Sequence, residues 1–218
     1  MIKIVYIISS IKTVGPIFML KNIIKYIPKD KFRIYLITIS ANQDDSLCLE
    51  FRNMGVEIYS LNYSRIRSFL FARSTIENKL QIIKPDIIHS HGLRADFINS
   101  KIRYSAKKVT TLRCFPYEDF INKYGRIVGT LTIHFFLKNM QRIDNRVACS
   151  NSISKRMEGK KSLIFTPIPN GLDLSKFNKT TNEHRLELRK NLKLPEDKKI
   201  FIAVGDIAEG KNPKLIFD

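Results

Sequence analysis

Short apolar segments alternate with helical patterns along most of the 218-residue chain, and this order restricts the possible folds more than any other feature. The segments are rich in Ile and Val, as is typical of strands buried on both faces. A helix between two such strands returns the chain across one face of a sheet, so that the strands run parallel. We therefore predict an α/β fold with a Rossmann-like, doubly wound parallel sheet. The expected strands are residues 1–9, 32–39, 56–61, 86–88, 107–112, 146–149 and 162–166.

Apolar residues spaced three or four apart predict the helices between these strands. One helix is expected to begin at Pro16, because proline suits the first helical position. Another is expected to end before Gly55, since glycine commonly follows the last helical residue. A further helix should begin after Ser150, which is a good N-cap. The remaining predicted helices are residues 65–83, 93–105 and one long helix over 119–143.

The last part of the chain differs in composition and predicts a second domain. Residues 174–199 are polar and charged, with one weak helical pattern over 183–192, and we interpret them as a connector. Residues 200–205 predict a new buried strand, and a helix should begin at Pro213. One strand and one turn of helix cannot form a core of their own. We therefore expect residues 1–173 to form the first domain and 200–218 to begin a truncated second domain.

Charge and cysteine content narrow the class of ligand and the compartment. The net charge of +18 favours anionic partners such as nucleic acid, lipid surfaces or phosphorylated ligands. A basic nucleic-acid-binding module remains an alternative, although no recognition motif supports it. The cysteines lie far apart without C-x-x-C pairing, which indicates free thiols in a reducing compartment. The apolar N-terminal segment is too short to span a membrane and has no secretory cleavage site.

Two histidines directly follow the strand expected at residues 86–88. Ligands of open α/β sheets bind at the carboxyl ends of the strands, so His89 and His91 are placed for chemistry. From these residues alone, a purely structural role is an equally open alternative, in which the two histidines only satisfy their own hydrogen bonds. No further ligand at metal-binding spacing accompanies them, and we expect no metal. Gly15 precedes another predicted helix, where free backbone N–H groups can meet an anion, but no G-x-G-x-x-G is present.

Four segments together resemble the family 4 glycosyltransferases of the GT-B fold, which are bacterial sugar transferases that use nucleotide-activated donors. The similarity extends over nearly the whole chain, in the family's order and spacing. The segments are Lys84–Gly92, Val147–Ser150, Ile168–Asp173 with Phe177, and Val204–Ile207 with Lys211 and Asn212.

The resemblance implies two Rossmann-like domains facing across a cleft, with the acceptor on the N-terminal domain and the nucleotide sugar on the C-terminal one. His91, with His89 beside it, resembles the histidine that contacts the transferred sugar. Gly15, Gly205 and Lys211 would lie at the donor phosphates, where Lys211 would stabilise the diphosphate leaving group.

The resemblance also implies partners and a location. Arg94 and Arg113 would lie on the acceptor side, and Asn170 in a structured turn before the connector. The reaction would retain anomeric configuration and pass the sugar to a glycan or lipid-linked acceptor in cell-surface polysaccharide synthesis. The nucleotide sugar would be a co-substrate, with no further cofactor. The basic charge fits a cytoplasmic protein held peripherally at the inner, anionic face of the membrane.

Two departures from the family bear on activity. Asp206 stands where the family has Arg, and a carboxylate would repel a diphosphate. The sequence also stops before the family's acidic Glu-x7-Glu motif, so we expect little or no transfer by this chain alone. A non-catalytic binding protein built on the same domain is therefore an alternative. A P-loop over residues 205–212 is a weaker one, because Asn212 lacks the hydroxyl that binds Mg²⁺.

Overall fold

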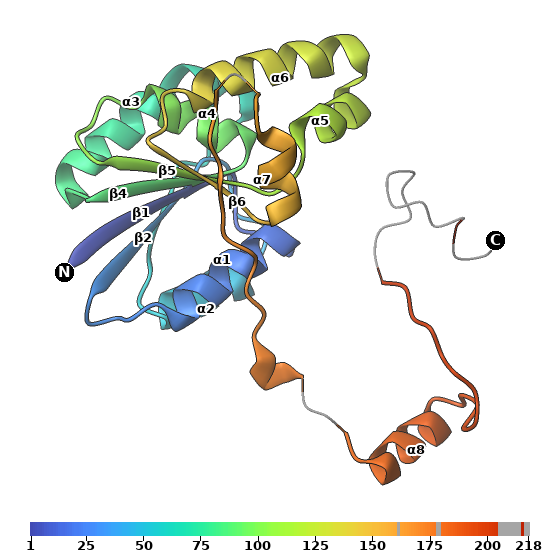
Figure 1. The fold of residues 1–218 in the computed structure, drawn as a ribbon. Helices are drawn as coiled ribbons and strands as arrows, with labels where there is room; N and C mark the ends of the chain where they lie inside the picture. The colour runs from blue at the N-terminus through green and yellow to red at the C-terminus, as the bar shows by residue number, and fades with distance from the viewer. Residues whose placement is uncertain (161, 178–179, 205–214, 216–218) are drawn as a thin grey trace. The chain divides into compact units, whose positions relative to one another are not determined.

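Seven parallel strands form one sheet in the order β3-β2-β1-β4-β5-β6-β7. The computed structural model describes residues 1–160, 162–177, 180–204 and 215, and the chain divides into two units, Met1–Leu172 and Asp173–Asp218. The sheet belongs to the first unit (Figure 1). Its α/β class and doubly wound parallel topology confirm the prediction. The strands are β1 (Ile2–Ile8), β2 (Phe32–Thr38), β3 (Glu57–Ser60), β4 (Ile87–His91), β5 (Lys107–Leu112), β6 (Asn145–Ala148) and β7 (Thr166–Pro167).

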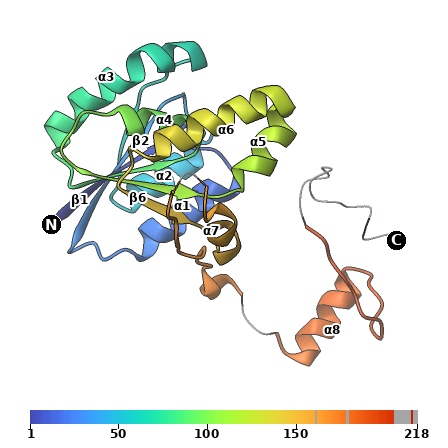
Figure 2. The ribbon, with the colours of Figure 1, turned by 45° about the horizontal axis from the view of Figure 1, so that its top comes forward.

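Helices cover both faces of the sheet, as parallel strands buried on both sides require. Figures 1 and 2 show α1 and α2 on one face and α3, α4 and α6 on the other. The helices of the first unit are α1 (Gly15–Tyr26), α2 (Asp45–Asn53), α3 (Arg65–Ile83), α4 (Leu93–Lys101), α5 (Pro116–Tyr124), α6 (Arg126–Met140) and α7 (Asn151–Met157).

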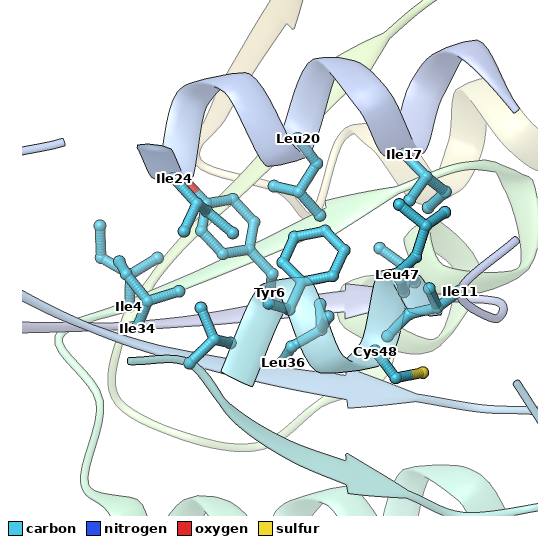
Figure 3. Close-up of a cluster of buried hydrophobic side chains, with 13 residues drawn as sticks. Ile4, Tyr6, Ile11, Ile17, Leu20, Ile24, Ile34, Leu36, Leu47 and Cys48 are labelled. Atoms are coloured by element: carbon cyan, nitrogen blue, oxygen red, sulfur yellow. The ribbon is translucent and has the colours of Figure 1, made fainter. Parts of the chain in front are cut away.

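Alternate residues of each central strand enter different cores, because successive side chains of a strand point to opposite faces. On β1, Tyr6 packs with α1 and α2, whereas Val5 and Ile7 pack with α3 and α4. Figure 3 shows the first of these cores, with Leu20 of α1 and Leu36 of β2 pointing toward one another around Tyr6. A third core lies around β5, β6, α5, α6 and α7.

The structure corrects two predictions in the first unit. The single helix expected over 119–143 is two helices, because Gly125 between α5 and α6 has a φ of +77° that a continuous helix cannot adopt. The strand expected over 162–166 is only the pair Thr166–Pro167. Ser162 has a φ of +54° in a turn, and residues 163–165 form no ladder.

The second unit contains a 3₁₀ helix, η1 (Leu174–Lys176), and α8 (Asn182–Asn191), which confirms the weak helical pattern. The buried strand expected over 200–205 is wrong for its described part. Residues 200–204 form no strand, and Phe201 is 91% exposed. A strand exists only through pairing with a neighbour, and these residues have none in the described part of the chain. No helix within the described residues is long and apolar enough to cross a membrane.

Candidate functional site

The centre of the sheet contains a topological switch point. β1 lies between β2 and β4, so the chain leaves β1 toward one side and returns on the other. The adjoining connections separate at such a point and leave a crevice at the carboxyl ends of the two strands, where α/β proteins bind ligands. The register pairs Ile8 of β1 with His91 of β4, which places His91 at this edge.

His89 and His91 form a small aromatic cluster with Tyr6. The two imidazole centroids lie 4.4 Å apart, and the Tyr6 ring lies 5.1 Å from His89 and 5.7 Å from His91. All three side chains are on the face of the sheet covered by α1, because Tyr6 belongs to that core and pairs with His89. His89 also contacts Thr111 of β5, with 2.9 Å between Nε2 and Oγ1.

Arg113, which directly follows β5, fixes the orientation and tautomer of His91. Its Nη2 lies 3.2 Å from Nδ1 of His91, and its Nη1 donates to the side-chain oxygen of Asn170 at 3.1 Å. A guanidinium can only donate, so Nδ1 accepts and the proton of the neutral ring is on Nε2. This Nε2 has no hydrogen-bond partner among the described residues, although it is buried.

Burial keeps both rings neutral. It lowers the pKa of His89 to about 3, with a further contribution from the Arg113 charge. Burial also places the pKa of His91 well below its ordinary value, and His89 and Arg113 add to the shift. His91 is buried at 8% exposure and His89 is partly exposed, and the register places the pair at the carboxyl end of β4. His91 is therefore equipped to donate a neutral hydrogen bond to a ligand, and not to act as an acid at neutral pH.

Gly15 is the first residue of α1, on the same face of the sheet as the histidine pair. A Cβ at Gly15 would meet no described heavy atom within 4 Å, and its φ is not positive. Neither packing nor backbone geometry therefore requires glycine here. Val14 provides no side-chain cap to the helix, and the first turn of a helix is where an anion can meet the positive end of the helix dipole.

Arg94 and Arg113 bond to different parts of the sheet edge, Ser40 and His91, although the resemblance implies one acceptor side for both. Arg94 lines a cavity of about 750 Å³, whose wall includes residues of α3, α4, α5 and α6 and of the loops that follow β1 and β2. Its Nη2 donates to Oγ of Ser40 at 2.9 Å. The structure therefore brings together His89, His91 and Arg113, whereas Arg94 lines the cavity and bonds to Ser40.

Two other assignments, Gly205 and Lys211, lie outside the described residues. Within the described part of the chain, no group of three His, Cys, Asp or Glu side chains could hold a metal ion.

Sequence reasoning missed a buried polar network behind the histidines. Ser90 points away from them, and its hydroxyl donates to the carboxylate of Asp96 at 2.7 Å, as does Thr110 at 2.6 Å. Burial raises the pKa of Asp96 to about 6. The alternation of side chains along β4 was the available signal, because Ser90 must face opposite to His89 and His91.

Comparisons with known proteins agree with this architecture. The model of Glycosyltransferase Family 4 matches residues 19–176. The O-antigen biosynthesis glycosyltransferase WclY of Escherichia coli is 22% identical over 223 residues, which cover 98% of this chain and 56% of WclY. The chain thus spans about half the length of the curated relatives it matches.

Solved structures share the fold. Anabaena HepE in complex with UDP aligns with a TM-score of 0.65 and 15% identity, over 88% of this chain and 50% of HepE. A glycosyltransferase from Rickettsia africae aligns with a TM-score of 0.62 and 16% identity, over 90% of this chain and 50% of that chain. UDP-GlcNAc 2-epimerase from Neisseria meningitidis, bound to UDP-GlcNAc, aligns with a TM-score of 0.57 and 14% identity. The alignment covers 88% of this chain and 54% of the epimerase. Because the family model covers most of the sequence, this chain belongs to Glycosyltransferase Family 4.

Proposed function

We propose that this protein contributes to the transfer of a sugar from a nucleotide-sugar donor to a glycan or lipid-linked acceptor in cell-surface polysaccharide synthesis, with retention of configuration. Membership of Glycosyltransferase Family 4 supports the reaction class. The O-antigen role named for WclY supports the pathway, and the UDP and UDP-glucose complexes of HepE support a nucleotide-sugar donor.

The observation that carries the proposal is the free Nε2–H of His91 at the switch point. It would donate to a hydroxyl of the transferred sugar, and burial makes this hydrogen bond stronger than it would be in water. Arg113 would act as a positioning residue through Nδ1 of His91 and not as an acceptor ligand. His89 would pack beside His91 and hold the ring in place.

The donor phosphates would lie at the backbone of Gly15, at the start of α1. We also propose that Gly205 and Lys211 bind the donor phosphates, as the resemblance implies. No resident metal is needed in this scheme, because helix dipole and lysine would stabilise the leaving diphosphate. We further propose that the 218-residue chain transfers little or no sugar by itself, and that the protein works on the cytoplasmic side of the membrane as a peripheral protein.

A chimera tests the role of His91. This chain would be continued by the C-terminal half of WclY, and sugar transfer from a panel of nucleotide sugars to membrane glycolipids would be measured. We expect transfer by the chimera, loss of at least about a hundredfold in His91→Ala, and none by the 218-residue chain. His134→Ala is the matched control, because His134 is exposed on α6. Full turnover by the His91→Ala chimera would exclude the proposed role.

A further inference from the structure

We propose that Asn170 is a positioning residue of the histidine site, which is formed by His89, His91 and Arg113. Its side-chain oxygen holds Arg113, and Arg113 in turn sets the tautomer of His91. The free Nε2–H of His91 therefore depends on residues 168–172, which we call the exit segment because they lead from β7 to the last residue of the first unit. This inference rests on the proposed function, since it adds a residue to the site proposed for sugar transfer.

A single guanidinium connects the exit segment with the imidazole. Nη1 of Arg113 donates to the side-chain oxygen of Asn170 at 3.1 Å, and Nη2 lies 3.2 Å from Nδ1 of His91. Both nitrogens belong to one planar and rigid group, so that holding one of them also restrains the other. Asn170 therefore acts on His91 through one rigid side-chain group.

Arg113 has little else to fix its orientation. Among the described residues, its buried Nε has no hydrogen-bond partner, and no carboxylate forms an ion pair with it. Burial lowers the pKa of Arg113, which indicates that its surroundings compensate the charge only weakly. The hydrogen bonds to Asn170 and His91 thus orient this side chain, and the loss of one of them leaves a long, flexible side chain with a single anchor.

The backbone of the exit segment does not explain why residue 170 is an asparagine. Asn-Gly pairs occur in turns mainly because both residues tolerate a positive φ, yet neither Asn170 nor Gly171 has one. Asn170 is also exposed, so core packing does not require its amide. The hydrogen bond to Arg113 gives this side chain a role that the turn itself does not.

The exit segment is attached to the sheet directly before Asn170. β7 pairs with β6, and the N–H of Ile168 donates to the carbonyl oxygen of Ala148 at 2.9 Å. Two residues after Asn170, the first unit ends at Leu172. Asn170 thus lies between this attachment and the boundary of the unit, and a displacement of the chain at the boundary reaches Asn170 before it reaches the sheet.

The consequence for His91 is a change in hydrogen-bonding chemistry. The hydrogen bond made by one ring nitrogen decides which nitrogen of a neutral imidazole carries the proton. While Arg113 donates to Nδ1, the proton is on Nε2, and the ring can donate to a sugar hydroxyl. Once Arg113 is no longer held, Nδ1 can carry the proton, and Nε2 becomes an acceptor. The site therefore presents its donor only while the exit segment is in place.

Nitrogen-15 NMR of the His91 ring in the full 218-residue chain at pH 7 tests the proposal. Asn170→Ala should lower the ratio of the Nε2–H tautomer to the Nδ1–H tautomer by about fivefold, the equivalent of one hydrogen bond of about 1 kcal/mol. Asn170→Asp keeps an oxygen acceptor on a side chain of the same length and should restore the wild-type ratio.

Leu172→Ala is the matched control, because it shortens another exposed side chain of the exit segment, and it should leave the ratio unchanged. The double variant Arg113→Ala/Asn170→Ala, compared with Arg113→Ala, tests the path. Because Asn170 acts through Arg113, its loss should add nothing in a chain that already lacks the guanidinium. Circular dichroism checks that every variant is folded. An unchanged ratio in Asn170→Ala, an equal change in Leu172→Ala or additive effects in the double variant would each overturn the proposal.

The tautomer ratio needs neither nucleotide sugar nor transfer, so the two proposals fail separately. Full turnover by the His91→Ala chimera would exclude the proposed function whatever the tautomer. An unchanged ratio in Asn170→Ala would exclude this inference even if the chimera needs His91.

Discussion

The two faces of the sheet differ sharply at its carboxyl edge. On the face covered by α1, His91 is neutral and almost fully buried, with its orientation fixed by Arg113. On the side covered by α3, α4 and α6, a cavity is lined by the basic side chains of Lys12, Arg65, Arg94 and Lys123 and by the exposed Phe69 and Leu131. A single oriented donor suits recognition of one hydroxyl group, whereas a broad basic and apolar surface suits an extended anionic partner. One sheet edge can therefore serve two kinds of contact, because alternate residues point to opposite faces.

Gly129→Ala tests the packing of α6 against α5, and we expect it to have the largest effect on stability. A Cβ at Gly129 would lie 2.7 Å from Cα of Ile121 and 2.8 Å from the carbonyl oxygen of Phe120, both backbone atoms of α5. We expect the free energy of unfolding to fall by about 3 kcal/mol, the upper part of the range for overpacking. Urea denaturation measures this, with Gly171→Ala as the control, since a Cβ there meets no described atom within 4 Å. Equal stability of the two variants would show that α5 and α6 are not closely packed.

Asp96→Asn should change the pH dependence of stability. The pKa of Asp96 is raised to about 6 by burial, and that of an unfolded aspartate is about 3.9. Between these values the folded state binds more protons, so this group makes stability fall as pH rises. Asn cannot ionise, and its side-chain oxygen can still accept from Ser90 and Thr110.

The difference in unfolding free energy, Asp96→Asn minus wild type, should therefore grow by on the order of 2 kcal/mol from pH 4 to pH 6. The lowered pKa values of His89 and His91 act in the opposite direction, with stability lost on acidification below about pH 6.5. That contribution is common to both proteins and cancels in the difference. Urea titrations across this range provide the measurement, and a constant difference would contradict a raised pKa of Asp96.

Arg113→Gln should weaken the histidine site and leave the cavity lined by Arg94 intact. It removes the hydrogen bonds to His91 and Asn170, at a cost of about 1 kcal/mol in unfolding free energy. It also removes a positive charge beside both rings, so the pKa values of His89 and His91 should rise. Proton NMR titration of the histidine rings follows this change. Arg113→Lys keeps the charge and should hold the pKa values closer to wild type; identical titrations in both variants would rule out the charge effect.

Leu70→Ser/Ile127→Ser should have the smallest effect on stability, within about 0.5 kcal/mol per substitution, because both side chains are largely exposed. Thermal unfolding compares it with Ile88→Ala, whose fully buried side chain on β4 should cost about 2–5 kcal/mol. A large loss in the serine variant would mean that these side chains pack within the protein.

The sequence predicted the sheet well because its strands are short β-branched runs separated by clear turn residues. His89 and His91 could be placed at the sheet edge for the same reason, since a strand end and its residues are local features. The prediction of one long helix over 119–143 was wrong because the apolar pattern continues across Gly125. Only the positive φ of Gly125 breaks the helix there.

The remaining features depend on distant contacts. The different partners of Arg113 and Arg94 could not be predicted without knowing which face each strand end presents. The cavity combines Phe69, Phe97 and Leu131 from three helices, and no local pattern relates them. The described part of the strand expected over 200–205 illustrates the same point, because an apolar run becomes a strand only when a neighbouring strand pairs with it.

The central claim is that the switch point presents a neutral imidazole whose Nε2–H is free for a ligand. Nitrogen-15 NMR of the His91 side chain in the full chain, from pH 5 to pH 8, tests it most directly. The account predicts a neutral ring with the proton on Nε2 and an unprotonated Nδ1 over the whole range. A protonated imidazolium above pH 5, or a proton on Nδ1, would contradict it.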